Sequence, residues 1–141
     1  MSKLTQEIKS SMQAIERISE FKTCARFIFS KKFIGFKGHF PNKPILPGVC
    51  KIQAALLMLQ ERKHKNVRLT EIILAKFFAP VTFNQELVFN LEEHPKNQPV
   101  LPQAKAIPER GSPEVDTHIT VKVSCLDKKI AELQLKVNIL E

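Results

Sequence analysis

A histidine on a proline-rich loop is the first feature of this chain that suggests chemistry. Residues 38–49 read GHFPNKPILPGV, and three of these twelve residues are prolines. Proline fixes the backbone and lacks an amide donor, so neither a helix nor a central strand fits this spacing. His39 therefore lies on a rigid irregular loop, where an imidazole can move a proton at neutral pH.

The loop leads directly into a predicted helix. Pro47 and Gly48 precede residues 49–62, a run rich in Ala, Leu and Met. The first backbone N–H groups of a helix are free and carry the positive end of its dipole. They can stabilise a developing oxyanion. A base near such a site is the minimal equipment for removing a proton beside a thioester carbonyl.

The elements that must hold this site form an α+β pattern. Apolar residues cover nearly the whole circumference of helix 49–62, which predicts a helix buried in the core. At about 21 Å it is too short to cross a membrane. The predicted strands are two extended segments within residues 14–30, then 72–79, 86–91, 119–125 and 131–139. The last two strands alternate apolar and polar residues and are joined by a tight hairpin at 126–129.

The chain length predicts one domain, residues 1–141. Residues 1–13 form an N-terminal arm, either a short helix or a loose segment. Residues 93–116 contain five prolines and lose the strand pattern, so we expect an inserted Pro-rich loop there. A sheet that covers a single helix leaves its edges open, which predicts a homodimer or a larger homo-oligomer.

Charge and composition narrow the function classes. The net charge is +8, and residues 1–76 hold 15 Lys and Arg against five Asp and Glu, which suggests an acidic partner or simply a solvated surface. No apolar run is long enough for a membrane span, and the polar start is not a secretory signal, so we expect a cytoplasmic protein. The three cysteines and four histidines lack metal-ligand spacing, so no metal site is predicted.

The stretch around His39 resembles the signature of the β-hydroxyacyl-acyl-carrier-protein dehydratases, the FabZ/FabA family. That signature reads G-H-F-P, two variable residues, P, two more, and P-G before a helix. Pro80 and Val81 after the strand that ends near Phe77, and the hairpin of residues 117–139, extend the likeness. The resemblance implies the hotdog fold, a curved antiparallel sheet around one long central helix. It also implies a dimer in which each active site takes its two catalytic residues from different subunits.

The resemblance further implies a role for each matching residue. His39 would be the catalytic base, and the Gly48 N–H would bind the thioester oxygen. The residues lining the acyl tunnel would be Phe40, Pro41, Pro47 and Val49. No cofactor is expected beyond the phosphopantetheine arm that carries the substrate on an acidic acyl carrier protein or on coenzyme A.

Position 53 departs from the family pattern. The family carries Glu or Asp fourteen residues after the histidine, whereas this chain has Gln53. A carboxylic acid can pass a proton to a leaving hydroxyl, but an amide can only hydrogen-bond to it. Gln53 can therefore orient a substrate or water, or serve as a buried amide that satisfies the loop. Glu61 lies about 12 Å further along the helix and Glu71 begins a strand, so neither replaces the acid.

Three functions remain open from the sequence. The first is a 3-hydroxyacyl-carrier dehydratase, a hydro-lyase that forms a trans-2-enoyl thioester in fatty-acid-type or polyketide-like biosynthesis. The second is an acyl-thioester-binding hotdog subunit that lost its acid and partners an active dehydratase. The third is a hotdog thioesterase. A nucleic-acid binder is disfavoured because surface aromatics are not interleaved with the basic residues. Basic residues that could dock a carrier are Lys31, Lys32, Lys37 and Lys43.

Overall fold

The computed structural model describes residues 2–36, 44–95 and 114–140. Its elements in chain order are α1 (Lys3–Ser10), β1 (Met12–Ser19), β2 (Lys22–Ile28), a 3-10 turn (Ile34–Phe36), α2 (Gly48–Lys63), β3 (Val67–Phe77), β4 (Glu86–Pro95), β5 (Glu114–Cys125) and β6 (Lys128–Leu140). Within these residues, no helix has the length and apolar character that a bilayer span requires.

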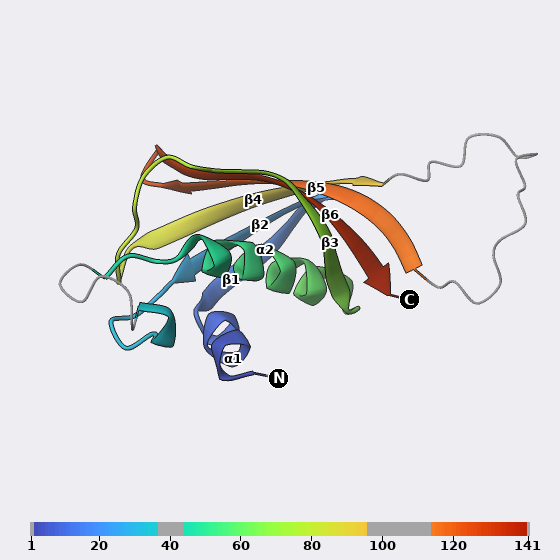
Figure 1. Ribbon diagram of the computed structural model, residues 1–141. Coiled ribbons are helices and arrows are strands. Elements are labelled where there is room, and N and C mark those ends of the chain that lie inside the picture. Colours follow the sequence, from blue (N-terminus) through green and yellow to red (C-terminus); the bar gives the residue numbers. More distant parts are fainter. Residues whose placement is uncertain (1, 37–43, 96–113, 141) are drawn as a thin grey trace, which may run out of the picture.

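The six strands form one antiparallel sheet in the order β1-β2-β4-β5-β6-β3. The sheet curves over α2, and α1 packs against α2 on the side away from the sheet (Figure 1). The predicted architecture of two strands, one central helix and four further strands is therefore confirmed. The predicted arm at residues 1–13 contains a short helix, capped by the side chain of Ser2.

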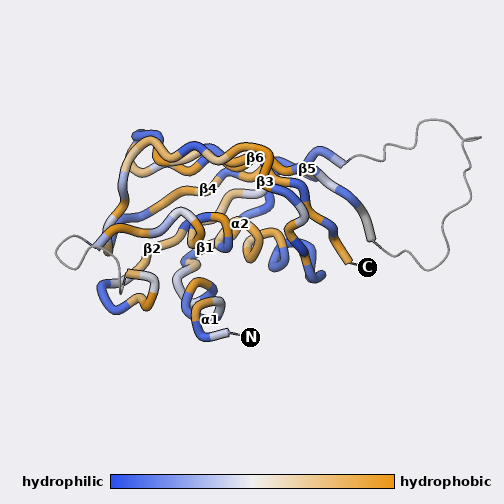
Figure 2. The backbone as a smooth tube through the Cα atoms, in the orientation of Figure 1, coloured by the Kyte–Doolittle hydropathy of each residue, from blue (hydrophilic) through white to orange (hydrophobic). Residues whose placement is uncertain are grey.

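The core lies between α2 and the inner face of the sheet. Inward positions alternate along the strands, as at Leu87, Phe89 and Leu91, and all three are at most 2% exposed. Figure 2 shows apolar stretches along α2 and along the strands that arch over it. The helix is buried on nearly all sides as predicted, because α1 covers part of the face that the sheet leaves open. Val49 is the exception at 58% exposed, since it lies in the first turn of α2, which α1 does not cover.

The last two strands are longer than the alternation predicted. Their turn is only Leu126 and Asp127, whose φ angles of 48° and 66° are both positive, as in a two-residue hairpin of type I′. Strand β4 continues to Pro95 and β5 begins at Glu114, so strand pairing reaches into both ends of the segment predicted as a loop. The remaining residues 96–113 lie outside the described part of the chain.

Strand β3 differs most from its prediction at 72–79. It begins at Val67 and ends at Phe77, and it lies at one edge of the sheet, paired with β6 alone. Ile72 and Ile73 are 48% and 42% exposed. The apolar run that predicted this strand lies on an open sheet edge.

Candidate active site

The helix start that the sequence pointed to is present and open. Helix α2 begins at Gly48, and its N-cap Pro47 has an extended backbone with φ −63° and ψ 149°. No side chain in the described residues caps this end, and the first turn contains no acidic residue. The Cys50 N–H is already bonded to the Pro47 carbonyl at 3.1 Å. The N–H groups of Gly48 and Val49 have no acceptor among the described residues, so they can meet a ligand.

Phe77 gives a reason for glycine at position 48. The aromatic ring at the end of β3 lies so close to the helix that a Cβ atom on Gly48 would come within 2.7 Å of the ring atom Cζ. Only a residue without a side chain permits this approach with the ring in place. The sequence indicated the glycine, but it contained no sign of the aromatic ring that faces it.

A cavity of about 490 Å³ lies in front of this helix start. Its walls are mainly apolar, from residues 45–48 on one side and Phe77, Phe78, Ala79 and Pro80 on the other, with Lys51 as its cation. A second cavity of about 520 Å³ shares Ile45 and Pro80 with the first and extends to Phe83. Mostly apolar cavities of this size with a few polar groups are typical of small-molecule sites.

Lys51 is a site residue that the sequence reasoning missed. It is 3% exposed, its Nζ donates to the Leu46 carbonyl at 3.2 Å, and Nζ lies 5.2 Å from the centroid of the Phe77 ring. Burial lowers the pKa of its ammonium, and the adjacent Cys50 thiol opposes that effect. The available signal was a lysine in the first turn of a helix that was predicted to be buried.

The segments on both sides of the predicted catalytic loop are held at this helix start. Gly35 lies against the Phe33 ring, and a Cβ atom on it would come within 3.0 Å of the Cys50 Sγ. Phe36 contacts the Phe83 ring at 6.3 Å between centroids. After the loop, the Leu46 N–H donates to the Val81 carbonyl at 2.7 Å. The aromatic and backbone contacts thus anchor residues 33–36 and 44–46.

Several predicted site residues lie outside the described part of the chain. They are the base His39, the tunnel residues Phe40 and Pro41, and the basic residues Lys37 and Lys43. Their predicted roles stay predictions. Lys31 and Lys32, the other two basic residues considered for docking, are exposed.

Gln53 is half-buried, one helical turn after the exposed Val49. Residues four apart share a helix face, whereas residues two apart do not. Val49 and Gln53 therefore lie together on one face, while Gly48 and Lys51 line the cavity on another. Among the described residues, no side-chain or backbone group hydrogen-bonds to the Gln53 amide, so its predicted part in orienting substrate stays a prediction.

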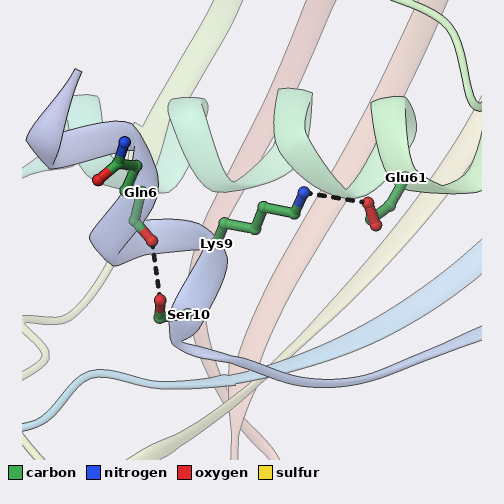
Figure 3. A network of polar contacts seen from close by, with 4 residues as sticks. All are labelled: Gln6, Lys9, Ser10 and Glu61. Atoms are coloured by element: carbon green, nitrogen blue, oxygen red, sulfur yellow. Dashed lines mark hydrogen bonds and ion pairs between the residues drawn. The ribbon is translucent and has the colours of Figure 1, made fainter. Parts of the chain in front are cut away.

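The two glutamates considered as replacement acids point elsewhere. Glu61 forms an ion pair with Lys9 of α1 at 3.6 Å, near the opposite end of α2 (Figure 3). Glu71 pairs with Lys136 at 3.7 Å across β3 and β6, and its side chain is 58% exposed. Neither carboxylate lines the cavity at Gly48.

The three histidines outside the loop lie on the surface. His64 ends α2 in the left-handed region with φ 56°, and its side chain is exposed. His94 lies 3.2 Å from the Thr120 hydroxyl on the outer face of the sheet, and His118 is exposed beside it in the β4–β5 pairing. These side chains do not line the cavity at Gly48.

Comparison with solved structures supports the fold assignment. The dehydratase heterocomplex ApeI:P from Xenorhabdus doucetiae matches with a TM-score of 0.66 at 17% identity, over 89% of this chain and 95% of that chain. The uncharacterized protein PH1136 from Pyrococcus horikoshii matches with a TM-score of 0.59 at 16% identity, over 100% and 94% of the two chains. A mutant of a hypothetical thioesterase protein from Streptococcus pneumoniae matches with a TM-score of 0.57 at 7% identity, over 89% and 88%. These likenesses confirm the hotdog fold.

Sequence comparison supplies the family. No curated protein matches the chain. The family model named ApeI-like, for the ApeI dehydratase, matches residues 14–107, which is more than half of the sequence. The match spans the predicted catalytic loop, the start of α2 and strand β3. The resemblance to dehydratases is confirmed at this level, and the narrower FabZ/FabA assignment is not. The chain belongs to the ApeI-like dehydratase family.

Proposed function

We propose that this protein removes water from a 3-hydroxyacyl thioester to give a trans-2-enoyl thioester. One observation carries the proposal: the mainly apolar cavity of about 490 Å³ opens at an uncapped helix start, in a chain of a dehydratase family. The apolar walls suit an acyl chain, and the free N–H groups suit the oxygen of its thioester.

The proposed reaction assigns one task to each group. His39 takes the proton from C2, and the Gly48 N–H binds the thioester oxygen while negative charge develops there. The electron pair then forms the C2–C3 double bond as the hydroxyl leaves C3. Because the Gln53 amide is not an acid, the proton that completes water comes from the imidazolium formed in the first step or from solvent. Gln53 hydrogen-bonds to the leaving hydroxyl and orients it.

A second copy of the chain completes the proposed site. Strand β3 is eleven residues long, forms one edge of the sheet, and exposes Ile72, Ile73 and Phe77. A long apolar edge of this kind is covered in a stable protein. We propose that two copies pair along β3, which places the second subunit next to Phe77 and the cavity at Gly48. The substrate carrier is an acidic acyl carrier protein or coenzyme A, for which Lys31 and Lys32 offer exposed positive charge.

The direct test follows the mass of the acyl group. The purified protein is incubated with a 3-hydroxyacyl carrier thioester, with His39→Ala in parallel, and the carrier is analysed by intact-mass spectrometry. Loss of one water by the wild type and none by His39→Ala supports the proposal. Release of the free acid from the carrier supports a thioesterase instead, the activity named for the Streptococcus pneumoniae neighbour.

A specific observation also favours an acyl-binding subunit. The neighbour from Xenorhabdus doucetiae is a heterocomplex, and this chain has Gln53 where an acid is expected. A subunit of that kind would bind the acylated carrier without removing water, and would pair with a complete dehydratase. No mass change despite carrier binding, with turnover appearing in Gln53→Glu, would support this second function over the first.

A further inference from the structure

A buried lysine lines the candidate cavity, and the contacts of its ammonium among the described residues are uncharged. Lys51 is 3% exposed, and its Nζ contacts are the Leu46 carbonyl at 3.2 Å and the Phe77 ring at 5.2 Å. Within residues 2–36, 44–95 and 114–140, none of its contacts is an acidic group. Removing an ammonium from water is costly unless an opposite charge compensates for it.

The position of Lys51 on α2 adds to that cost. It lies in the first turn, where the helix dipole is positive and where this helix has no acidic residue. A cation is disfavoured at that end. Burial, the dipole and the lack of a counter-charge among the described residues all oppose the ammonium, and only the Leu46 carbonyl and the Phe77 ring offset that cost there. A buried charge that opposes stability in a cavity is a candidate for ligand binding.

The ammonium reaches back toward the start of α2. Helical side chains lean toward the N-terminus, and the Lys51 Nζ reaches back to the carbonyl of Leu46, two residues before Gly48. Gly48 and Lys51 are three residues apart on one helix face and line the same cavity. The Phe77 ring contacts both residues. A single oxygen atom in the cavity can therefore meet a neutral N–H donor and a full positive charge.

We propose that the Lys51 ammonium and the Gly48 N–H together bind the thioester oxygen of the substrate, with Lys51 as a further catalytic residue. This inference rests on the proposed function. As His39 removes the C2 proton, the electron pair moves toward the carbonyl and the oxygen becomes negative. The ammonium stabilises that charge and keeps its own protons. The pair then returns to form the C2–C3 double bond as the hydroxyl leaves and is protonated to water.

An octanoate titration tests the charge site without any turnover. Octanoate has an apolar tail and a negative head, and octanamide is its neutral counterpart. By calorimetry, we expect Lys51→Met to bind octanoate about tenfold or more weakly than the wild type, and octanamide about equally. Lys51→Arg should keep most of the octanoate affinity. Equal octanoate affinity in wild type and Lys51→Met would overturn the proposal.

Lys129→Met is the matched control for that titration. The Lys129 Nζ lies 5.4 Å from the centroid of the neighbouring Phe78 ring, but Lys129 is exposed and does not line the cavity. The substitution thus removes a similar cation–ring contact and should leave octanoate binding unchanged. Circular dichroism checks that each variant is folded, and Lys51→Gln takes the place of Lys51→Met if the methionine variant does not fold.

Turnover then separates this inference from the proposed function. Because the oxygen is fully negative only near the transition state, Lys51→Met should lower kcat about tenfold or more and change KM much less. An unchanged kcat in Lys51→Met beside an active wild type would overturn the catalytic role. If the wild type removes no water but octanoate binding still depends on Lys51, the dehydratase assignment fails and the anion site stands.

Discussion

The tip of the Phe77 ring points at the backbone of Gly48, with room for a hydrogen atom but not for a methyl group. This contact joins the end of the sheet's edge strand to the first turn of the central helix, and it forms one wall of the candidate cavity. Phe77 is nevertheless 47% exposed, because none of the described residues covers its outer side. The helix start, the cavity and the open sheet edge are therefore one connected region.

Gly48→Ala should damage this region even though alanine is the better helix former. Its Cβ would displace the Phe77 ring, and we expect the free energy of unfolding to fall by about 1–2 kcal/mol, against the gain that helix propensity alone predicts. Chemical denaturation measures the change. In a Phe77→Leu background, where the ring is gone, the same substitution should cost clearly less. Equal costs in the two backgrounds would show that the ring is not the obstacle.

Lys51→Met should stabilise the fold while it weakens anion binding. The methionine keeps a long apolar side chain and removes the buried charge, so we expect the melting temperature to rise by about 3 °C. Lys129→Met should change it little, since that side chain is exposed. A fall in melting temperature for Lys51→Met would mean that the ammonium supports the fold through its bond to Leu46.

The stability difference between wild type and Lys51→Met should shrink as pH rises. Burial holds the folded pKa of Lys51 below its ordinary value of 10.5. Between the folded pKa of Lys51 and its ordinary value, the unfolded chain binds more protons than the folded chain. The free energy of unfolding of the wild type therefore increases with pH in that range. Burial also raises the pKa of the Cys50 thiol above 9.0, which acts in the opposite direction above that pH. Denaturation from about pH 7 to 10 in a Cys50→Ala background isolates Lys51, and a constant difference would contradict this prediction.

A charge on the edge of β3 should separate the proposed dimer. We expect Ile73→Lys to convert the protein to monomers and to abolish water loss, because a buried lysine opposes pairing and the site lacks its second subunit. Light scattering coupled to gel filtration reports the mass. Ile18→Lys places the same charge at an exposed position of the opposite edge strand β1, with Ile18 55% exposed, and should leave the mass unchanged. Dimers that persist in Ile73→Lys would rule out pairing along β3.

Gln53→Glu tests whether the missing acid limits turnover. A carboxylic acid at this position can protonate the leaving hydroxyl. General acid catalysis typically increases a reaction rate by about 10²–10⁴-fold. We expect kcat to rise in Gln53→Glu. The pH profile of kcat should also gain a limb on which kcat falls as the pH increases through the pKa of the new acid. Gln53→Met, which removes the amide without adding an acid, should lower kcat. If glutamate and methionine have the same effect, Gln53 does not contact the hydroxyl.

The local parts of this protein could be predicted from the sequence. The proline spacing and the Ala- and Leu-rich run that follows it predicted a helix over residues 49–62, one residue short of α2 at each end, because proline and helix propensity act over a few residues. The alternation in residues 119–125 and 131–139 predicted the closing hairpin for the same reason. The turn itself contains only Leu126 and Asp127 and is shorter than the predicted turn at residues 126–129, because Lys128 and Lys129 pair within the sheet.

The tertiary structure alone decided which residues meet at the site. The apolar run that begins at Ile72 predicted a strand but not its place in the sheet, and the order of strand pairing puts it at an open edge. That order depends on contacts between distant segments, which no local pattern encodes. In the same way, the sequence places Lys51 on a helix predicted to be buried but does not show what surrounds its ammonium. The tertiary structure brings Phe77, twenty-six residues later in the chain, against both Lys51 and Gly48.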